Sequence, residues 1–179
     1  PGFSPDVTSY DYDAPINEAG QVTPKYMELR EMLSGYSDKK LPSIPKEFPV
    51  INVPKIQFTE VAPLFENLPA PHASMDIQTM EAFNQGWGSI LYRTKTPAVP
   101  TQSILTITDA HDFAQVFING KLIGSIDRRN HEKTMLLPAM KEGDQLDILV
   151  EAMGRINFGR AIKDFKGITE KVELSYPMN

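Results

Sequence analysis

The chain has 179 residues, with 18 basic and 23 acidic side chains, a net charge of −5 and no cysteine. The length suits one domain with room for an appendage, and the lack of cysteine excludes disulfide scaffolds, thiol catalysis and cysteine-ligated zinc. Mild acidity argues against binding to nucleic acid, which usually needs a basic face. No apolar run approaches the ~20 residues that cross a bilayer, and no signal peptide opens the chain. We therefore expect a soluble protein with neither nucleic-acid nor membrane partners.

The N-terminal region predicts a loop followed by one helix. Residues 1–22 are rich in turn formers and have no apolar periodicity. Thr23 is typical of a helix N-cap and Pro24 of the first helical position, while Gly35 marks an end. The apolar face of this helix consists of Tyr26, Leu29, Met32 and Leu33. No neighbouring segment would cover that face, although an apolar stripe normally packs against another element.

A proline-rich strap separates this region from the rest of the chain. Seven prolines fall between residues 42 and 71, and proline excludes both a regular helix and a central strand. We expect an extended linker over residues 41–74, with a short edge strand around Ile51–Phe58.

The remaining residues, 75–179, predict short strands. Asn119-Gly120 between two such strands is a strong hairpin signal. Turn signals recur every 8 to 15 residues, as in a sandwich or jelly roll. The expected strands are 89–94, 103–107, 113–118, 121–126, 134–137, 146–150 and 171–175. The fold class is thus mainly β, a jelly-roll sandwich preceded by a loop, one α-helix and the strap.

Familiar catalytic motifs are missing. The three histidines, at positions 72, 111 and 131, lack metal-ligand spacing, and neither a GxSxG elbow nor a phosphate-binding glycine loop occurs. We therefore expect no metal and no cofactor.

The acidic and aromatic run at residues 10–13 admits two interpretations. Asp11 and Asp13 lie two residues apart, so on a strand they would share a face about 7 Å apart, within the range of a glycosidase carboxyl pair. The alternative is that both bind backbone groups at a turn. Tyr10 and Tyr12 could stack on a sugar or pack in a core.

Two later features also have competing interpretations. Residues 153–160 carry glycines around Arg155 and Asn157, which suits a tight loop whose polar side chains bind buried carbonyls, or else a ligand site. The Asp164–Gly167 segment is expected to be a structural turn. Trp87, between two glycines, is expected to be a core residue, with an exposed sugar platform as the alternative.

Taken together, these segments resemble glycoside hydrolase family 35, the β-galactosidases. The resemblance is carried by Thr8–Pro15 (TSYDYDAP) with Glu18–Gly20 and Thr23–Tyr26, and then by downstream blocks in the same order. Those blocks are Gly88–Thr94, His111-Asp112, Arg128–Asn130, Leu149–Gly159 and Asp164–Gly167. The resemblance covers almost the whole chain.

The resemblance implies a retaining enzyme that removes terminal β-linked galactose with two glutamates on a (β/α)₈ barrel. It implies that those glutamates lie upstream of Pro1, so that this chain holds no catalytic residue. In the family the second tyrosine of the TSYDYDAP run contacts galactose, which here is Tyr12, with Tyr10 beside it. Asp11 and Asp13 would then orient the loop. A secreted or periplasmic location is suggested by the family alone.

The implied organisation is a remnant of the catalytic barrel at residues 1–40, the linker at 41–74 and a galactose-binding-domain-like jelly roll at 75–179. The helix face would pack on the rest of the barrel. The alternative function is a carbohydrate-binding module, in which the jelly roll itself holds a saccharide.

Overall fold

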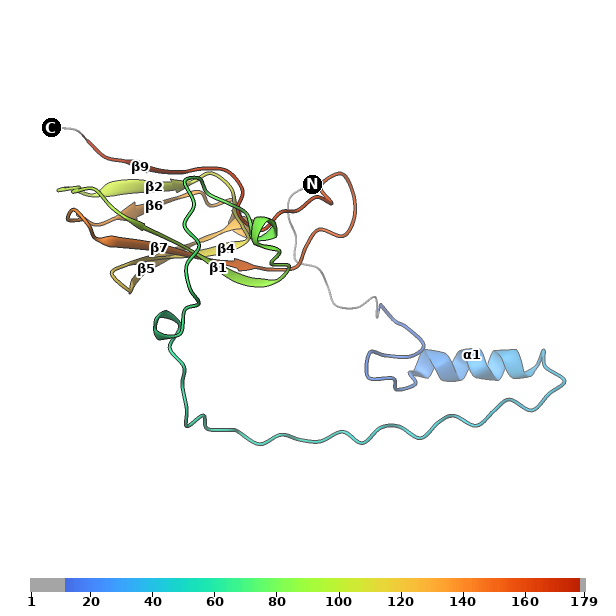
Figure 1. The fold of residues 1–179 in the computed structure, drawn as a ribbon. Helices are drawn as coiled ribbons and strands as arrows, with labels where there is room; N and C mark the ends of the chain where they lie inside the picture. The colour runs from blue at the N-terminus through green and yellow to red at the C-terminus, as the bar shows by residue number, and fades with distance from the viewer. Residues whose placement is uncertain (1–11, 178–179) are drawn as a thin grey trace. The chain divides into compact units, whose positions relative to one another are not determined.

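The computed structural model describes residues 12–177. The chain divides into two compact units, with a boundary between Val61 and Ala62, and each unit is described by itself (Figure 1).

In the first unit, helix α1 spans Pro24–Ser34. Thr23 is its N-cap residue, Pro24 opens the first turn and Gly35 follows the last residue, so the predicted helix and both its ends are confirmed. The predicted apolar face is largely exposed, with 54% of Met32 and 53% of Leu33 accessible to solvent. Within the described chain, α1 has no buried residue.

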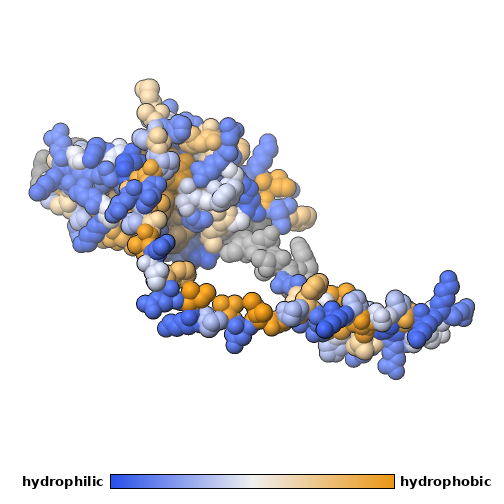
Figure 2. Space-filling model, turned by 60° about the horizontal axis from the view of Figure 1, so that its bottom comes forward, coloured by the Kyte–Doolittle hydropathy of each residue, from blue (hydrophilic) through white to orange (hydrophobic). Residues whose placement is uncertain are grey.

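The strap after α1 is extended but forms no strand. Residues 51–58, all of which are described, have no ladder partner, so the expected edge strand at Ile51–Phe58 is wrong. Pro54 removes one donor, and a strand needs a neighbour to satisfy the others. Figure 2 shows orange, hydrophobic side chains along this extended part of the chain, and Phe48 and Phe58 are among its exposed residues.

The second unit is an antiparallel β-sandwich. One sheet has the strand order β1-β7-β4-β5, a second has the order β6-β2-β9, and β3 pairs with β8. The strands are β1 (Gly88–Lys95), β2 (Ser103–Ile107), β3 (Ala110–His111), β4 (Phe113–Ile118), β5 (Lys121–Asp127), β6 (Thr134–Leu137), β7 (Gln145–Ala152), β8 (Gly167–Ile168) and β9 (Val172–Ser175). Helical turns are η1 (Leu64–Glu66), η2 (Met80–Phe83) and η3 (Arg128–Asn130). The predicted mainly β fold is therefore confirmed.

The hydrophobic core forms because apolar residues alternate with other residues along the strands and so lie on one face of each sheet. Along β4 and β7, alternate apolar side chains turn inward, and they meet the inward residues of β2 and β6 from the other sheet. Figure 1 shows the two sheets as facing layers. The buried core residues are Val99, Leu105, Ile107, Ala110, Ala114, Val116, Ile118, Ile126, Leu137, Met140, Leu146, Ile148, Val150 and Ile168.

The predicted hairpin joins β4 to β5. Asn119 and Gly120 have φ of 50° and 77°, the left-handed conformations that a two-residue hairpin loop requires. The Asn119 side chain fixes the loop further, since it accepts from the Gln145 N–H at 2.9 Å.

Candidate functional site

Tyr12 lies on the surface of the first unit, with 73% of its area exposed. It precedes Asp13, whose φ of 59° turns the chain sharply. Tyr10 and Asp11, the other predicted residues of this run, lie outside the described residues. Tyr12 is therefore placed on a tight loop rather than in a core.

The loop that follows Tyr12 closes on itself. Ile16 and Val22 form an antiparallel bridge, and the side chain of Asn17 accepts from the Gln21 N–H at 2.9 Å. Gly20 supplies the left-handed residue of this turn, with φ of 75°. The segment is thus a closed, internally bonded loop.

Two side chains bind this loop, that of Thr23, the N-cap residue of α1, and that of Lys25 in its first turn. The Thr23 hydroxyl is within donating distance of two carbonyl oxygens, that of Ala14 at 2.9 Å and that of Pro15 at 3.0 Å. Lys25 Nζ donates to the Asp13 carboxylate at 2.7 Å and to the Asp13 carbonyl at 3.0 Å. The residue after Tyr12 is therefore bound through both its side chain and its backbone.

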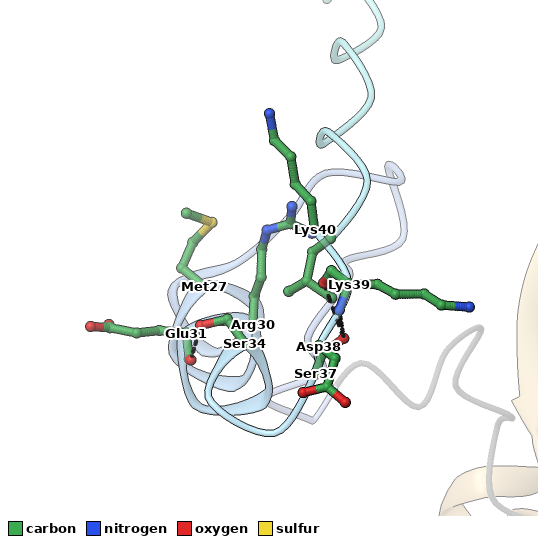
Figure 3. Close-up of a pocket in the computed structure, with 9 residues that line it drawn as sticks. Met27, Arg30, Glu31, Ser34, Ser37, Asp38, Lys39 and Lys40 are labelled. Carbon is green, nitrogen blue, oxygen red and sulfur yellow. Dashed lines mark hydrogen bonds between the residues drawn. The ribbon is translucent and has the colours of Figure 1, made fainter.

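A hollow of about 620 Å³ lies elsewhere in this unit. It is formed between α1 and residues 37–41, and Tyr12 is not among its lining residues. Figure 3 shows Glu31, Lys39 and Lys40 extending away from one another. Because no polar groups converge there, the hollow offers no recognisable binding chemistry.

The second unit brings the downstream sequence blocks together in a buried ionic cluster. Lys166, fully buried, donates to Asp112 Oδ2 at 2.6 Å and pairs with Asp164 Oδ2 at 2.7 Å. Arg128 Nη1 donates to Asp112 Oδ1 at 2.6 Å and to Asp164 Oδ1 at 2.9 Å. Two cations and two carboxylates thus alternate, so that each buried charge faces its opposite.

Electrostatics within this cluster favour the ionised form of Asp164. Burial acts to raise the pKa of Asp164, but hydrogen bonds from Lys166 and Arg128 outweigh it and lower that pKa below its usual value. His111 borders the cluster, with Nδ1 2.6 Å from the Phe165 carbonyl and Nε2 2.9 Å from Asp109 Oδ2.

Arg155 links three segments at the same end of the sandwich. Its guanidinium donates to the carbonyl of Asp164 at 2.8 Å and to that of Gly86 at 3.1 Å, and it pairs with Glu81 at 2.6 Å. The prediction that Arg155 binds backbone carbonyls is confirmed. The Asp164–Gly167 segment is structural as expected, although it is mostly buried rather than a surface turn.

The expectation that Trp87 fills the core is wrong, since 85% of its surface is exposed. The indole precedes β1, between Gly86 and Gly88, and the core is filled by aliphatic residues of the strands instead. The alternative interpretation, an exposed platform, fits this position.

Sequence reasoning missed Glu81 and the role of Tyr92. Glu81 lies on the short turn η2, which has no periodic signal, and it accepts from the Lys166 N–H at 3.1 Å. Tyr92 accepts from the Ile168 N–H at 2.9 Å and donates to the Gln78 carbonyl at 2.8 Å. These hydrogen bonds join residues far apart in sequence, so no local pattern predicts them. The alternation of polar and apolar residues in β1 indicated only that Tyr92 lies on a strand.

Within residues 12–177, no group of three or more histidine, cysteine or acidic side chains is arranged to hold a metal ion. Among the same residues, no helix has the length and apolar character needed to cross a membrane.

Comparison with known proteins gives two family matches. The model described as "Beta-galactosidase, first all-beta domain" matches residues 78–178, and that of "Glycosyl hydrolases family 35" matches residues 1–36. The first match contains the ionic cluster and the second contains the Tyr12 loop.

Two proteins with similar sequences are named β-galactosidases. A β-galactosidase of Xanthomonas manihotis is 36% identical over 96% of this chain and 29% of its own length. A β-galactosidase of Bos taurus is 34% identical over 96% of this chain and 27% of its own length. The chain therefore spans less than a third of these relatives. Among solved structures, it is similar to a GH2 β-galacturonidase from Eisenbergiella tayi bound to glycerol, with 17% identity, coverage of 54% of this chain and 18% of that one, and a TM-score of 0.42.

Proposed function

Because this chain belongs to the family 35 β-galactosidases, we propose that it is part of a retaining exo-β-galactosidase that hydrolyses terminal, non-reducing β-D-galactose. In this proposal the first unit supplies a substrate-contacting loop and the sandwich is structural. The substrate is a β-galactoside, bound by the whole enzyme rather than by this chain alone.

The observation that carries the proposal is the exposed Tyr12 on its closed loop. Its ring is accessible, and the backbone on its C-terminal side is bound by Lys25 and Thr23. A tyrosine held this way offers a face for the C–H surface of a sugar and a hydroxyl for hydrogen bonding. We propose that Tyr12 contacts galactose and that Tyr10 lines the same pocket.

Asp13 is assigned to loop geometry rather than to acid–base chemistry. Its carboxylate pairs with Lys25 at 2.7 Å, whereas a retaining glycosidase needs two carboxyl groups roughly 5 Å apart across the scissile bond. We propose that the two catalytic glutamates lie upstream of Pro1, on other strands of a (β/α)₈ barrel whose loops form the site.

The exposed face of α1 supports a packing partner of that kind. Leu29, Met32 and Leu33 are each more than a third exposed, and such a stripe normally lies against another element. We propose that residues 1–40 complete the barrel, that residues 41–74 connect it, and that residues 75–179 buttress it. A secreted or periplasmic location accords with this proposal.

The test is Tyr12→Phe in the whole enzyme. Loss of one hydroxyl contact with galactose should lower kcat/KM for a β-galactoside by roughly fivefold, the equivalent of about 1 kcal/mol. Tyr36→Phe is the matched control, because Tyr36 is also exposed, at 86%, and lies outside the loop. Unchanged kinetics in Tyr12→Phe would remove this residue from the site.

A further inference from the structure

We infer that the outer face of the sheet β1-β7-β4-β5 is a docking surface for the end of the strap, so that the sandwich domain begins at Ala62 rather than at residue 75. The docked segment, residues 62–67, contains the turn η1 and is called here the clasp. It belongs to the same compact unit as the sandwich. The inference goes beyond the proposed function, which treats residues 41–74 as a connection throughout.

A row of three residues crosses this outer face. Arg93 of β1 is paired with Asp147 of β7, and Asp147 is paired with Phe117 of β4. Since side chains alternate along a strand, these three point away from the core, which takes up the residues next to them, such as Leu146 and Ile118. Asp147 is nevertheless fully buried. The outer face of the sheet is therefore covered at this row.

Phe65, the middle residue of η1, lies over this row. Its ring meets that of Phe117 edge to face, with the ring centres 5.0 Å apart and the planes at 77°, an arrangement that the quadrupoles of two aromatic rings favour. The guanidinium carbon of Arg93 lies 6.0 Å from the centre of the Phe65 ring, at the limit of a cation–π contact. Figure 1 shows η1, in teal, on the side of the sandwich that this sheet forms. Phe65 thus contacts both residues that flank Asp147.

The sheet side of this contact is held in place by hydrogen bonds. Arg93 donates to both carboxylate oxygens of Asp147, from Nε at 2.7 Å and from Nη2 at 3.1 Å, and such a two-point pair fixes the plane of the guanidinium. Gln145 Nε2 donates to the same carboxylate at 2.9 Å. Because these side chains are already ordered, docking of the clasp costs less conformational entropy.

The clasp is ordered by hydrogen bonds of its own. The Asn67 N–H donates to the Leu64 carbonyl at 3.0 Å, and the Glu66 N–H donates to the Pro63 carbonyl at 3.2 Å. The Asn67 side chain also donates to the Pro63 carbonyl, at 2.7 Å. Pro63 is the N-cap residue of η1, and its ring restricts φ at this point. The clasp is therefore a preformed turn rather than a flexible stretch of linker.

A second contact follows further along the strap. The ring of His72 lies 5.6 Å from that of Phe83, which ends η2. The strap thus meets the sandwich unit at two points, Phe65 and His72. Upstream of the clasp, Phe48 and Phe58 are 82% and 88% exposed. The free part of the strap therefore ends where the boundary between the two units falls, and the clasp sets the point at which the chain joins the sandwich.

Limited digestion of the 179-residue chain with chymotrypsin tests the inference, because this protease cleaves after phenylalanine and cuts a docked residue only when it opens. We expect early cleavage after Phe48 and Phe58, and cleavage after Phe65 about tenfold more slowly. Mass spectrometry should then find a persistent fragment that begins at Thr59.

Phe117→Ala tests the docking surface itself. Removal of this ring should speed the cut after Phe65 about fivefold relative to the cut after Phe58, as expected for one lost aromatic contact. Phe113→Ala is the matched control, because Phe113 is also half-buried on the outer face of β4, and it should leave that ratio unchanged. Phe65→Ala keeps every residue of the sheet, and it should shift the NMR signals of the Phe117 ring but not those of Phe113.

Any of four outcomes would overturn the inference. The first is equal rates of cleavage after Phe58 and Phe65 in the wild type, and the second is a ratio in Phe117→Ala equal to that in Phe113→Ala. The third is a Phe117 ring whose signals do not respond to Phe65→Ala. The fourth is protection of Phe65 that grows with protein concentration, with a dimer in analytical ultracentrifugation, which would assign the surface to the clasp of a second copy. None of these measurements involves a sugar, so their failure would leave the proposed function untouched.

Discussion

Lys166 is the largest of the fully buried side chains in the described part of the chain. A buried ammonium is tolerated only when opposite charges and hydrogen bonds replace its water. Asp112, Asp164 and the Gly154 carbonyl, at 3.0 Å, supply that replacement. The side chain thereby joins β8, the start of β4 and the loop after β7 at one point.

Replacing Lys166 with methionine tests this role. The change keeps the length of the side chain but leaves two buried carboxylates with Arg128 as the remaining cation of the cluster core. We expect the free energy of unfolding in urea to fall by about 3 kcal/mol or more, because one partner of a buried pair is lost.

Lys171→Met is the matched control for that measurement. Lys171 also pairs with a carboxylate, that of Glu173 at 3.0 Å, but both side chains are at least half exposed. Exposed pairs contribute little, so a change below about 1 kcal/mol is expected. Equal losses in the two variants would contradict the importance of the buried cluster.

At the scale of elements, a structure set by neighbouring residues could be predicted from the sequence, whereas pairing between distant segments could not. The β4–β5 hairpin was predictable because Asn119-Gly120 carries its own turn geometry. The two-residue strands β3 and β8 were not, since their pairing joins Ala110 to Ile168 and no period fits two residues. The expected strand at 51–58 was wrong because the local pattern alone does not make a strand, and no neighbouring segment pairs with these residues.

Gly167 fixes the contact between β1 and β8. Its φ is 91°, and a Cβ there would lie 2.3 Å from Tyr92 Oη. Gly159 has the same φ but open space around it. Gly159→Ala should therefore cost only the left-handed strain, about 1 kcal/mol. Gly167→Ala should cost about 2 kcal/mol more, because Tyr92 must give up its two hydrogen bonds.

Unfolding measurements on both glycine variants check this prediction, and Tyr92→Phe makes it specific. Removing the hydroxyl removes the atom that would clash, so Tyr92→Phe should be far less costly in the Gly167→Ala background than in the wild type. Additive effects would show that the close approach to Tyr92 is not the cause.

At the scale of the whole molecule, the Tyr12 loop, the buried ionic cluster and the position of Trp87 were predictable to different degrees. Tyr12 could be named from the TSYDYDAP run by resemblance, because that motif is contiguous. The ionic cluster could not, because Asp112, Arg128 and Lys166 come from separate blocks that only the folded sandwich brings together. Trp87 was misassigned because flanking glycines do not distinguish an exposed loop from a buried one.

The proposed location of the two catalytic glutamates outside this chain predicts its activity in isolation. A retaining mechanism needs an accessible pair of carboxyl groups, one of which donates a proton while the other attacks. Asp13 is bound by Lys25, and Asp112 and Asp164 are enclosed with Lys166 and Arg128. Incubating the 179-residue chain with a chromogenic β-galactoside should therefore release no more product than a heat-treated control. Hydrolysis that disappears in the Asp11→Asn, Asp13→Asn double variant would instead assign the chemistry to the loop that carries Tyr12.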